Sequence, residues 1–395
     1  MNILTICQFY YPENFSITPL MRELVAMGHQ VTVITGRPNA GFGQILPEYR
    51  QTKFEIIDGV KVHRLPIVAR KQSKISLIIN YFSFYFLGRH FVRHHHGDYD
   101  VVFAMSLSPV ISLVPAVKYA KKHKLPLILY CVDIWPESVV FTNQIGRDTL
   151  GFKLLKHWSK QIYQSADRLL VGSPSYRQYM NEEHGISGDK IFTLVQPAIT
   201  ETSSGPAIEF KEGHHIVYIG NLGQVQLIEE LLEAFLMFGE TDLHLHLIGQ
   251  GSRYLHIKAF VNEHHLENRI HLYGTLASEV AATYGPNADA LLLPLKQDGY
   301  VGKTIPNKLM MYLQYARPII GALKGDGRDI LNQAGGGILV DPTKDGLIEG
   351  IQAVLSMSEQ EKSALGARNL AYFKEHHTLT KVVKELVHHL NDIKN

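Results

Sequence analysis

Glycine turns and helices follow apolar strands in a repeated order along the second half of the chain, and this order constrains the fold most. One apolar run ends at Gly220 and Gly223 and leads directly into a helical pattern over 227–238. A second run ends at Gly249, and a third apolar run follows at 289–294. Since strands that alternate with helices form βαβ units, this half of the chain is predicted to fold around a parallel sheet.

These turns lie at predicted strand ends, where an open parallel sheet binds its ligands. Glycine lets a backbone approach phosphates closely, and a helix N-terminus presents free N–H groups to an anion. The turns therefore predict a site for a nucleotide diphosphate, although each residue could also serve the turn alone. The candidate residues in these turns are Gly220, Asn221, Gly223, Gln226, Gly249, Gly251, Arg253, Tyr273 and Gly274.

A helix predicted to open near Asn307 adds positive charge to this set. Lys303 and Lys308 flank its start, and either could pair with phosphates or be a solvated surface cation. No Asp-x-Asp motif is placed for a metal-bound diphosphate, and the adjacent histidines among the 21 in the chain lack matched partners for a metal site. We therefore expect Lys303, Asn307 and Lys308 to bind the diphosphate without a metal.

The first half of the chain shows the same alternation, with carboxylates after one of its predicted strands. Asp133 and Glu137 follow the apolar run at 126–131 and flank Trp135. A carboxylate at a strand end could orient a substrate hydroxyl, whereas the simpler alternative is helix capping by Asp133 and ordinary packing of Trp135. We treat Asp133, Glu137 and Lys303 as the candidate catalytic residues. Further candidates in the loops of this half are Glu13, Asn14, Ser16, Ser106 and Ser108.

The length of the chain indicates more than one domain. At 395 residues it is too long for one ordinary core and suits two domains of roughly 150–200 residues each. A polar, loop-rich stretch over 200–213 predicts the boundary between a domain at 1–199 and a second at 214–375. Apolar residues at helical spacing from Leu379 to Ile393 predict a final helix within 376–395.

Composition excludes several classes of protein. A hydrophobic content of 45% with 19% charged residues is typical of a soluble globular chain, and a net charge of +2 is too small to indicate a nucleic-acid partner. The two cysteines, Cys7 and Cys131, lie near strand ends and are expected as buried thiols of a reduced compartment. With no signal-peptide pattern and no run of about 20 apolar residues, we expect a cytoplasmic location.

One segment suggests contact with a membrane surface. An aromatic and aliphatic run over 75–87 is preceded by Arg70 and Lys71 and followed by Arg89 and Arg93. Apolar residues bounded by cations suit a helix that lies in the membrane interface. The alternative is an internal helix that packs on the sheet.

Taken together, these motifs resemble those of the family-four retaining glycosyltransferases of the GT-B fold. The first half matches through Cys131–Ser138, which is similar to an Asp-Leu-Trp-Pro-Glu loop, and through Gly28–Thr35 and Ala166–Ser173. The chain most resembles the amino-sugar (N-acetylfucosamine-type) transferases of bacterial O-antigen, capsule and exopolysaccharide assembly, along nearly its whole length. The resemblance implies two facing Rossmann-like domains, an inter-domain cleft, and a C-terminal helix that crosses back to the first domain.

The resemblance also implies an activity. Such an enzyme moves a hexose or N-acetylhexosamine from a nucleoside-diphosphate sugar, with UDP the expected nucleotide, to a lipid-linked saccharide. It would work without a cofactor, attached peripherally to the inner face of the cytoplasmic membrane. The leaving diphosphate oxygen would take the acceptor's proton, so oriented N–H groups and cations matter more than a hydrolase-type carboxylate pair.

Four positions depart from the family pattern. Asn221 and Gln226 stand where many members carry an arginine and a lysine that pair with the diphosphate. Lys303 and Met311 stand where many members carry two glutamates, and a methionine is a poor acceptor for ribose hydroxyls. These departures keep two alternatives open: a noncatalytic GT-B partner of an active transferase, and a UDP-sugar epimerase.

Overall fold

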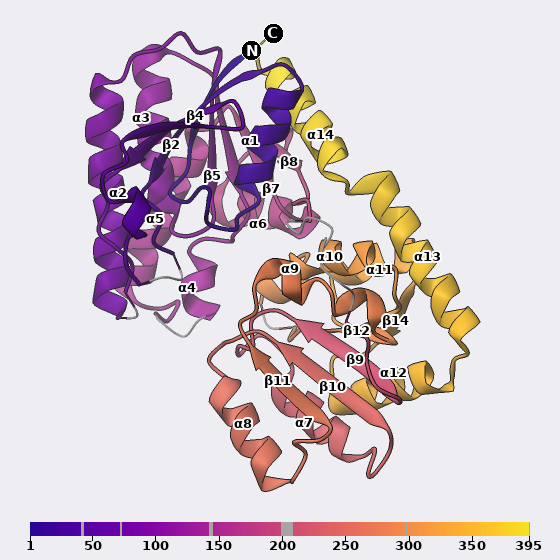
Figure 1. Cartoon of the computed structure of the whole chain (residues 1–395). Helices are drawn as coiled ribbons and strands as arrows, with labels where there is room; N and C mark the ends of the chain where they lie inside the picture. Colours follow the sequence, from indigo (N-terminus) through magenta and orange to yellow (C-terminus); the bar gives the residue numbers. More distant parts are fainter. Residues whose placement is uncertain (41–42, 72, 142–144, 199–207, 298, 395) are drawn as a thin grey trace. The chain divides into compact units, whose positions relative to one another are not determined.

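The chain divides into two compact units (Figure 1). Unit 1 comprises Met1–Ile199 and Leu379–Asn395, and unit 2 comprises Thr200–Thr378. The structure, a computed structural model, describes residues 1–40, 43–71, 73–141, 145–198, 208–297 and 299–394, without the side chains of Lys74, Phe141 and Val301. Of the stretch predicted as the domain boundary, residues 200–207 lie outside these ranges.

Unit 1 is built on a sheet of eight strands. Their spatial order is β3 (Phe54–Ile57), β4 (Val60–Leu65), β2 (Gln30–Gly36), β1 (Asn2–Ile6), β5 (Val101–Ser106), β6 (Leu127–Cys131), β7 (Arg168–Val171) and β8 (Ile191–Thr193). All neighbours pair in parallel except β3 and β4, which form an antiparallel hairpin around Asp58 and Gly59. Strands β5 and β6 are buried at every position, as expected for a sheet covered on both faces.

The C-terminal helix completes the core of unit 1. The helices of this unit are α1 (Ile17–Ala26), α2 (Lys74–His94), α3 (Val114–His123), α4 (Glu137–Phe141), α5 (Leu150–Gln164), α6 (Pro174–His184) and α14 (Leu379–Asp392), with short 3-10 turns η1 (Pro47–Tyr49), η2 (Val110–Leu113) and η3 (Gly188–Lys190). Helix α14 packs beside α1 (Figure 1) and buries Val383 and Leu386 in the same core as Leu20. The Thr380 hydroxyl also donates a hydrogen bond of 2.8 Å to Glu23. The predicted C-terminal helix is confirmed, and it belongs to the first unit.

Unit 2 is built on six parallel strands. Their spatial order is β11 (Ile270–Gly274), β10 (Leu243–Ile248), β9 (His214–Ile219), β12 (Ala290–Pro294), β13 (Ile319–Ala322) and β14 (Gly337–Val340). The chain adds β10 and β11 on one side of β9 and then returns to add the other three strands on its opposite side. This reversal places a topological switch point between β9 and β12, where doubly wound sheets bind ligands at the carboxyl ends of the strands. The predicted Rossmann-like architecture is confirmed.

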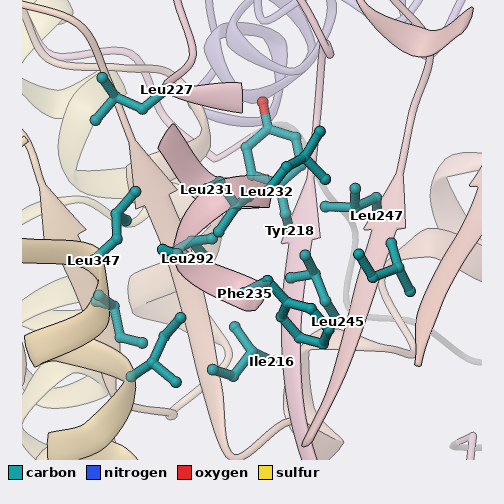
Figure 2. Packing of buried hydrophobic residues seen from close by; sticks show 14 of the residues in the cluster. Ile216, Tyr218, Leu227, Leu231, Leu232, Phe235, Leu245, Leu247, Leu292 and Leu347 are labelled. Carbon is teal, nitrogen blue, oxygen red and sulfur yellow. The ribbon is translucent and has the colours of Figure 1, made fainter. Parts of the chain in front are cut away.

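Hydrophobic side chains pack one face of this sheet against helices. The helices of unit 2 are α7 (Ile228–Leu236), α8 (Tyr254–Glu263), α9 (Ser278–Ala281), α10 (Lys308–Gln314), α11 (Asp326–Ala334), α12 (Lys344–Ser356) and α13 (Glu359–His376), with 3-10 turns η4 (Gly285–Asn287) and η5 (Val301–Lys303). Figure 2 shows Ile216 and Tyr218 of β9 with Leu231 and Phe235 of α7 and Leu347 of α12. Because side chains alternate along a strand, every second residue of β9 points to the opposite face.

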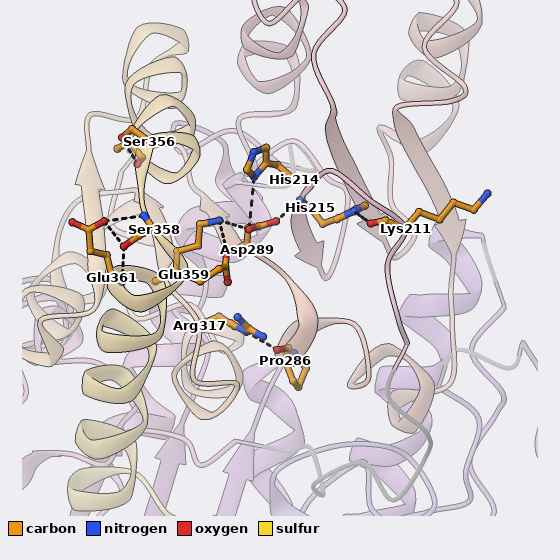
Figure 3. A network of polar contacts seen from close by, with 12 residues as sticks. Lys211, His214, His215, Pro286, Asp289, Arg317, Ser356, Ser358, Glu359 and Glu361 are labelled. Carbon is orange, nitrogen blue, oxygen red and sulfur yellow. Dashed lines mark hydrogen bonds and ion pairs between the residues drawn. The ribbon is translucent and has the colours of Figure 1, made fainter.

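A buried ion pair joins α13 to the amino end of the sheet (Figure 3). The side chain of Lys362 is 1% exposed, and its ammonium donates to Asp289 and, at 2.8 Å, to Glu359. Asp289, which directly precedes β12, also accepts the backbone N–H of His215 at 2.6 Å. Burial alone would raise the pKa of Asp289, but these hydrogen bonds hold that pKa below its usual value. The pair therefore keeps a carboxylate ionised inside the fold.

Replacing Lys362 by methionine should lower the free energy of unfolding by about 3–5 kcal/mol, because the Asp289 carboxylate then loses its cation. Denaturant unfolding followed by circular dichroism measures the change. The matched control is Lys344→Met, whose exposed ion pair with Glu233 at 3.6 Å should contribute less than about 1 kcal/mol. A loss for Lys362→Met no larger than for this control would contradict a stabilising role.

None of the helices within the described ranges combines the length and the hydropathy that crossing a bilayer requires.

Candidate active site

The carboxyl ends of β9, β10 and β11 meet through their glycine turns. The Gly220 N–H donates to the Ile248 carbonyl at 2.9 Å, and the Gly249 N–H donates to the Gly274 carbonyl at 2.8 Å. Gly220 and Gly249 have φ angles of 148° and 140°, which favour glycine. A Cβ atom on Gly249 would also collide with the Gly220 carbonyl oxygen. These turns therefore require glycine for their own packing, and that packing keeps both glycines half-buried at the switch point.

The first turn is held in shape by its own side chains. The buried Gln226 accepts the Gly223 N–H through Oε1 at 3.0 Å. The Tyr218 hydroxyl donates to the Asn221 carbonyl at 2.6 Å, and the Asn221 side chain is exposed. Of the predicted donor-binding residues in this turn, Gln226 is buried and stabilises the backbone of the turn, whereas the Asn221 side chain is exposed.

The turn after β10 packs onto the first turn. Leu222 donates its N–H to the Gln250 carbonyl and accepts the Arg253 N–H, each at 2.9 Å. Gly251 lies against the same backbone, where a Cβ atom would overlap the Leu222 carbonyl. The Arg253 guanidinium pairs with Glu229 at 3.0 Å, so its charge is compensated within the unit.

Lys308, the first residue of α10, places a cation beside the first turn. Its ammonium donates to the Tyr218 hydroxyl and lies 4.0 Å from the centroid of the Tyr218 ring. A Cβ atom on Gly220 would come within 2.8 Å of this ammonium. Burial lowers the pKa of Lys308 to about 7. No carboxylate of the described residues lies at ion-pair distance, so the switch point holds a desolvated cation without an anion.

Lys303 and Asn307 lie on the segment that leads from β12 to α10. Both side chains are exposed, and the Lys303 ammonium lies 5.7 Å from the centroid of the Tyr300 ring. A Cβ atom on Gly325 would overlap the Lys303 backbone, which places this segment against the turn after β13. The structure thus brings the segment to the carboxyl end of the sheet, where Lys308 also lies.

The Tyr273 side chain belongs to a chain of hydrogen bonds on the sheet. Its hydroxyl lies 2.9 Å from His246 Nδ1, and His246 Nε2 lies 2.9 Å from His215 Nδ1. Burial, helped by the neighbouring imidazoles, lowers the pKa of His246 to about 3, so this ring is neutral at pH 7. The phenol of Tyr273 is therefore engaged within the sheet, and the buried Gly274 accepts the Gly249 N–H through its carbonyl.

In unit 1, Asp133 lies just beyond the carboxyl end of β6. The residue is half-buried, and burial raises the pKa of its carboxyl to about 7. Burial also raises the pKa values of Tyr81 on α2 and Tyr163 on α5, and the nearby Asp133 charge adds to both shifts. No group of the described residues donates a hydrogen bond to the Asp133 carboxylate, so the helix-capping alternative finds no support there.

Glu137, the other carboxylate of this loop, is already paired. It is the first residue of α4, is buried, and accepts a hydrogen bond of 2.6 Å from Arg147. Trp135 lies between the two carboxylates in sequence and donates from Nε1 to the Ser108 hydroxyl at 2.7 Å. Arg147 was not among the sequence candidates, because no local pattern links it to a carboxylate ten positions earlier. Tyr218, the partner of Lys308, was missed for the same reason.

The loop after β1 uses its polar residues to join loops of unit 1. Glu13 accepts the backbone N–H groups of Asn39 at 2.8 Å and Ala40 at 2.6 Å. Ser16 donates to Gln196 at 2.8 Å, and both Glu13 and Ser16 are buried. These two sequence candidates therefore serve the fold of the unit.

Among the residues that the structure describes, His, Cys, Asp and Glu side chains form no group of three or more that could hold a metal ion. Cys7 and Cys131 are both buried free thiols. Burial raises the pKa of each thiol, so neither is a ready nucleophile or ligand.

Two family models match the chain, one in each half. A model described as "Glycosyl transferase 4-like domain" matches residues 15–194, and one described as "Glycosyl transferases group 1" matches residues 213–357. The probable glycosyltransferase WbjE of Pseudomonas aeruginosa is 25% identical over 245 residues. That match spans 59% of this chain and 59% of WbjE.

Solved structures share the fold over nearly the whole chain. Sucrose-phosphate synthase from Thermosynechococcus elongatus has a TM-score of 0.75 at 14% identity, over 100% of this chain and 99% of that one. Anabaena HepE in complex with UDP-glucose has a TM-score of 0.69 at 12% identity, over 99% and 100% of the two chains. WaaG, a glycosyltransferase involved in lipopolysaccharide biosynthesis, has a TM-score of 0.68 at 13% identity, over 99% of each chain. With glycosyltransferase models matching both halves and the fold matching throughout, the chain belongs to the family-four glycosyltransferases of the GT-B fold.

Proposed function

We propose that this protein transfers a hexose or N-acetylhexosamine from a nucleoside-diphosphate sugar to a lipid-linked saccharide in bacterial surface polysaccharide synthesis. The observation that best supports binding of the nucleotide-sugar donor is the desolvated Lys308 ammonium beside the Gly220 turn. UDP is the proposed nucleotide, because Anabaena HepE was solved with UDP and with UDP-glucose. The involvement of WaaG in lipopolysaccharide biosynthesis supports the proposed pathway.

The donor site is argued from charge and backbone geometry. A desolvated cation without an anion costs free energy, and a bound diphosphate would offset that cost. The cation lies at the switch point, where the half-buried glycine turns allow a close approach of backbone to phosphate. We place the diphosphate at Gly220, Asn221, Gly223, Lys303, Asn307 and Lys308, with Gln226 supporting the turn. The nucleoside then lies near Gly249, Gly251, Arg253, Tyr273 and Gly274.

The same cation suits the chemistry of the leaving group. When the bond between the sugar C1 and the diphosphate oxygen breaks, negative charge grows on that oxygen, and a fixed ammonium stabilises it. The acceptor hydroxyl forms the new bond to C1 and passes its proton to the departing oxygen. Asp133, whose carboxylate has no hydrogen-bond donor among the described residues, would accept from the acceptor hydroxyl and orient it.

A second candidate function is that of a noncatalytic partner of an active transferase. Met311 on α10 cannot accept a hydrogen bond from ribose as a glutamate would. The charge of Arg253 is compensated by Glu229, and Asn221 carries no charge. These three features favour a weaker donor site than one with the full family set of charged residues.

Calorimetric titration of the full chain with UDP, GDP, ADP and dTDP decides between these two candidates. We expect selective binding of UDP that is unchanged when magnesium is omitted, because Lys308 supplies the positive charge. Folded protein that binds none of the four nucleotides would support the noncatalytic partner.

Lys308→Ala should weaken binding of UDP-glucose by about tenfold or more, because it removes a charge-assisted hydrogen bond.

The affinity of the wild type for UDP-glucose should fall by up to about tenfold as the pH rises from about 6 to about 8, since an ammonium with a pKa near 7 loses its proton over that range. In Lys308→Arg the guanidinium stays charged, so this pH dependence should disappear.

The matched control for Lys308 is Lys324→Ala, which removes an exposed cation of unit 2 that pairs with Asp341 at 3.8 Å. It should bind UDP-glucose as the wild type does. If Lys308→Ala also binds as tightly as the wild type, Lys308 has no part in the donor site.

Asp133→Asn should lower transfer of labelled sugar into the lipid-linked saccharides of bacterial membranes about 100-fold, because the amide no longer orients the acceptor hydroxyl as a carboxylate does. Binding of UDP-glucose should not change. Asp148→Asn, which alters an exposed carboxylate of the same unit, is the control. Undiminished transfer by Asp133→Asn would contradict the assigned role, and conversion of the donor sugar without any acceptor would indicate an epimerase.

A further inference from the structure

Helix α2 presents an apolar face to solvent over its first three turns. Ile75 is 71% exposed and Phe86 is 60% exposed. The opposite face is fixed to the loops after β1 and β2, because the buried Asn80 accepts from Gln8 at 2.8 Å and donates to Asn39 at 3.2 Å. Residues spaced by three and four share one helix face, so the apolar row must point outward. This α2 row consists of Ile75, Ile78, Ile79, Phe82 and Phe86.

Helix α5 carries a second row of the same kind. Leu150, Leu154 and Trp158 are 84%, 49% and 38% exposed, at a spacing of four residues. Phe152 and Ile162 on the other side of the helix are buried and fix its orientation. We call these three exposed residues the α5 row.

Both helices belong to the same part of unit 1. Each packs against the buried turn η2, and both lie on the flank of the unit that Figure 1 shows with α3. Tyr81 of α2 and Tyr163 of α5 both lie near Asp133, and the Tyr163 hydroxyl donates to the Trp135 carbonyl at 3.4 Å. The two helices that carry the rows therefore both contribute a tyrosine beside the loop that carries the proposed acceptor residue.

Neither helix carries an acidic residue of its own, and the carboxylates near α5 include the exposed Asp148, two positions before Leu150, and Glu183, which pairs with Lys156 of α5. The sequence contains no Asp or Glu between Asp58 and Asp98, and none between Asp148 and Asp167. These two stretches contain all of α2 and all of α5. The exposed cations in and beside the two helices are Arg70, Lys71, Arg89, Arg93, Lys153 and Lys160.

We propose that the α2 row and the α5 row together form the surface by which this protein docks on a leaflet of anionic phospholipid. The apolar side chains enter the acyl boundary, and the cations beside them meet the phosphates of the headgroups. Exposed phenylalanine and tryptophan side chains on both helices suit this boundary. An anionic leaflet matches both the apolar rows and the excess of cations on the two helices, whereas a protein partner would need an apolar groove lined with acidic residues.

This docking extends the proposed function, because it brings a lipid-linked acceptor to the loop that holds Asp133. Vesicle binding needs neither donor nor acceptor, so its outcome does not depend on the proposed transferase activity. Failure of docking would leave the calorimetric result for UDP unchanged. Failure of UDP binding would leave the vesicle result unchanged.

Co-sedimentation of the full chain with two kinds of vesicle tests the surface. We expect binding to mixed phosphatidylglycerol and phosphatidylcholine vesicles, little binding to phosphatidylcholine alone, and release by added salt. Ile79→Ser with Phe86→Ser should lower the partition about tenfold or more, and Leu150→Ser with Leu154→Ser should lower it several-fold, because less apolar area is buried. The matched control is Met237→Ser with Leu255→Ser, which removes two exposed apolar side chains of unit 2.

Trp158 reports directly on the α5 row. The chain has two tryptophans, and Trp135 is buried whereas Trp158 is partly exposed. Vesicles that contain brominated phosphatidylcholine with phosphatidylglycerol should quench the Trp158 emission. Trp158→Phe should abolish this quenching while vesicle binding largely remains.

Several outcomes would overturn the proposal. Absence of binding to the anionic vesicles would do so, as would equal losses in the unit 2 control and in the row variants. Loss of binding in the α2 variant alone, with unquenched Trp158, would remove α5 from the surface and refute the two-helix docking. A concentration-dependent dimer that both row variants abolish, without vesicle binding, would assign the face to a second copy of the chain instead.

Discussion

Unit 2 depends on the close approach of two glycine turns at the carboxyl ends of β9 and β10. Gly249 lies so near the Gly220 carbonyl that no side chain fits between them, and Gly251 lies equally near the Leu222 carbonyl. Because parallel neighbours end at the same edge of a sheet, this contact fixes both turns at the switch point. The first turn also contains the Asn221 carbonyl, which accepts a hydrogen bond from the Tyr218 hydroxyl. The same hydroxyl accepts a hydrogen bond from the Lys308 ammonium. The backbone and the cation of the proposed donor site therefore follow from one packing contact.

Two lysines of unit 2, the buried Lys362 and the half-buried Lys308, differ in how their charge is compensated at the two ends of the sheet. At the amino end of the sheet, Lys362 is neutralised by Asp289 and Glu359 and stabilises the fold. At the carboxyl end, Lys308 has a phenol for a partner and no carboxylate among the described residues, and burial lowers its pKa to about 7. A desolvated cation without an anion does not stabilise the fold, but it can bind an anionic ligand.

Much of the fold follows from local patterns in the sequence, and the parts that were not predicted have a physical reason. The hairpin strand β3 was missed because it is an edge strand on which Phe54 and Ile56 are exposed, so its pattern does not resemble a buried strand. Helix α13 was missed because its buried face includes the polar residues Lys362 and Asn369. Its sequence therefore lacks the apolar residues at helical spacing that identify an amphipathic helix. In the candidate site, Asp133 and Glu137 are indistinguishable in sequence, yet only Glu137 is paired, because Arg147 reaches it.

The sequence by itself determined the alternation of strands and helices and the positions of the glycine turns, because hydrophobic period and turn residues are local properties. Only the tertiary structure decided which cation lies beside those turns and which apolar helix faces are left in solvent. Lys303 and Lys308 are alike in sequence, but one is exposed and the other is half-buried and bound to Tyr218, 90 positions away. Burial and pairing are set by contacts between residues far apart in the chain, and no local pattern contains those contacts.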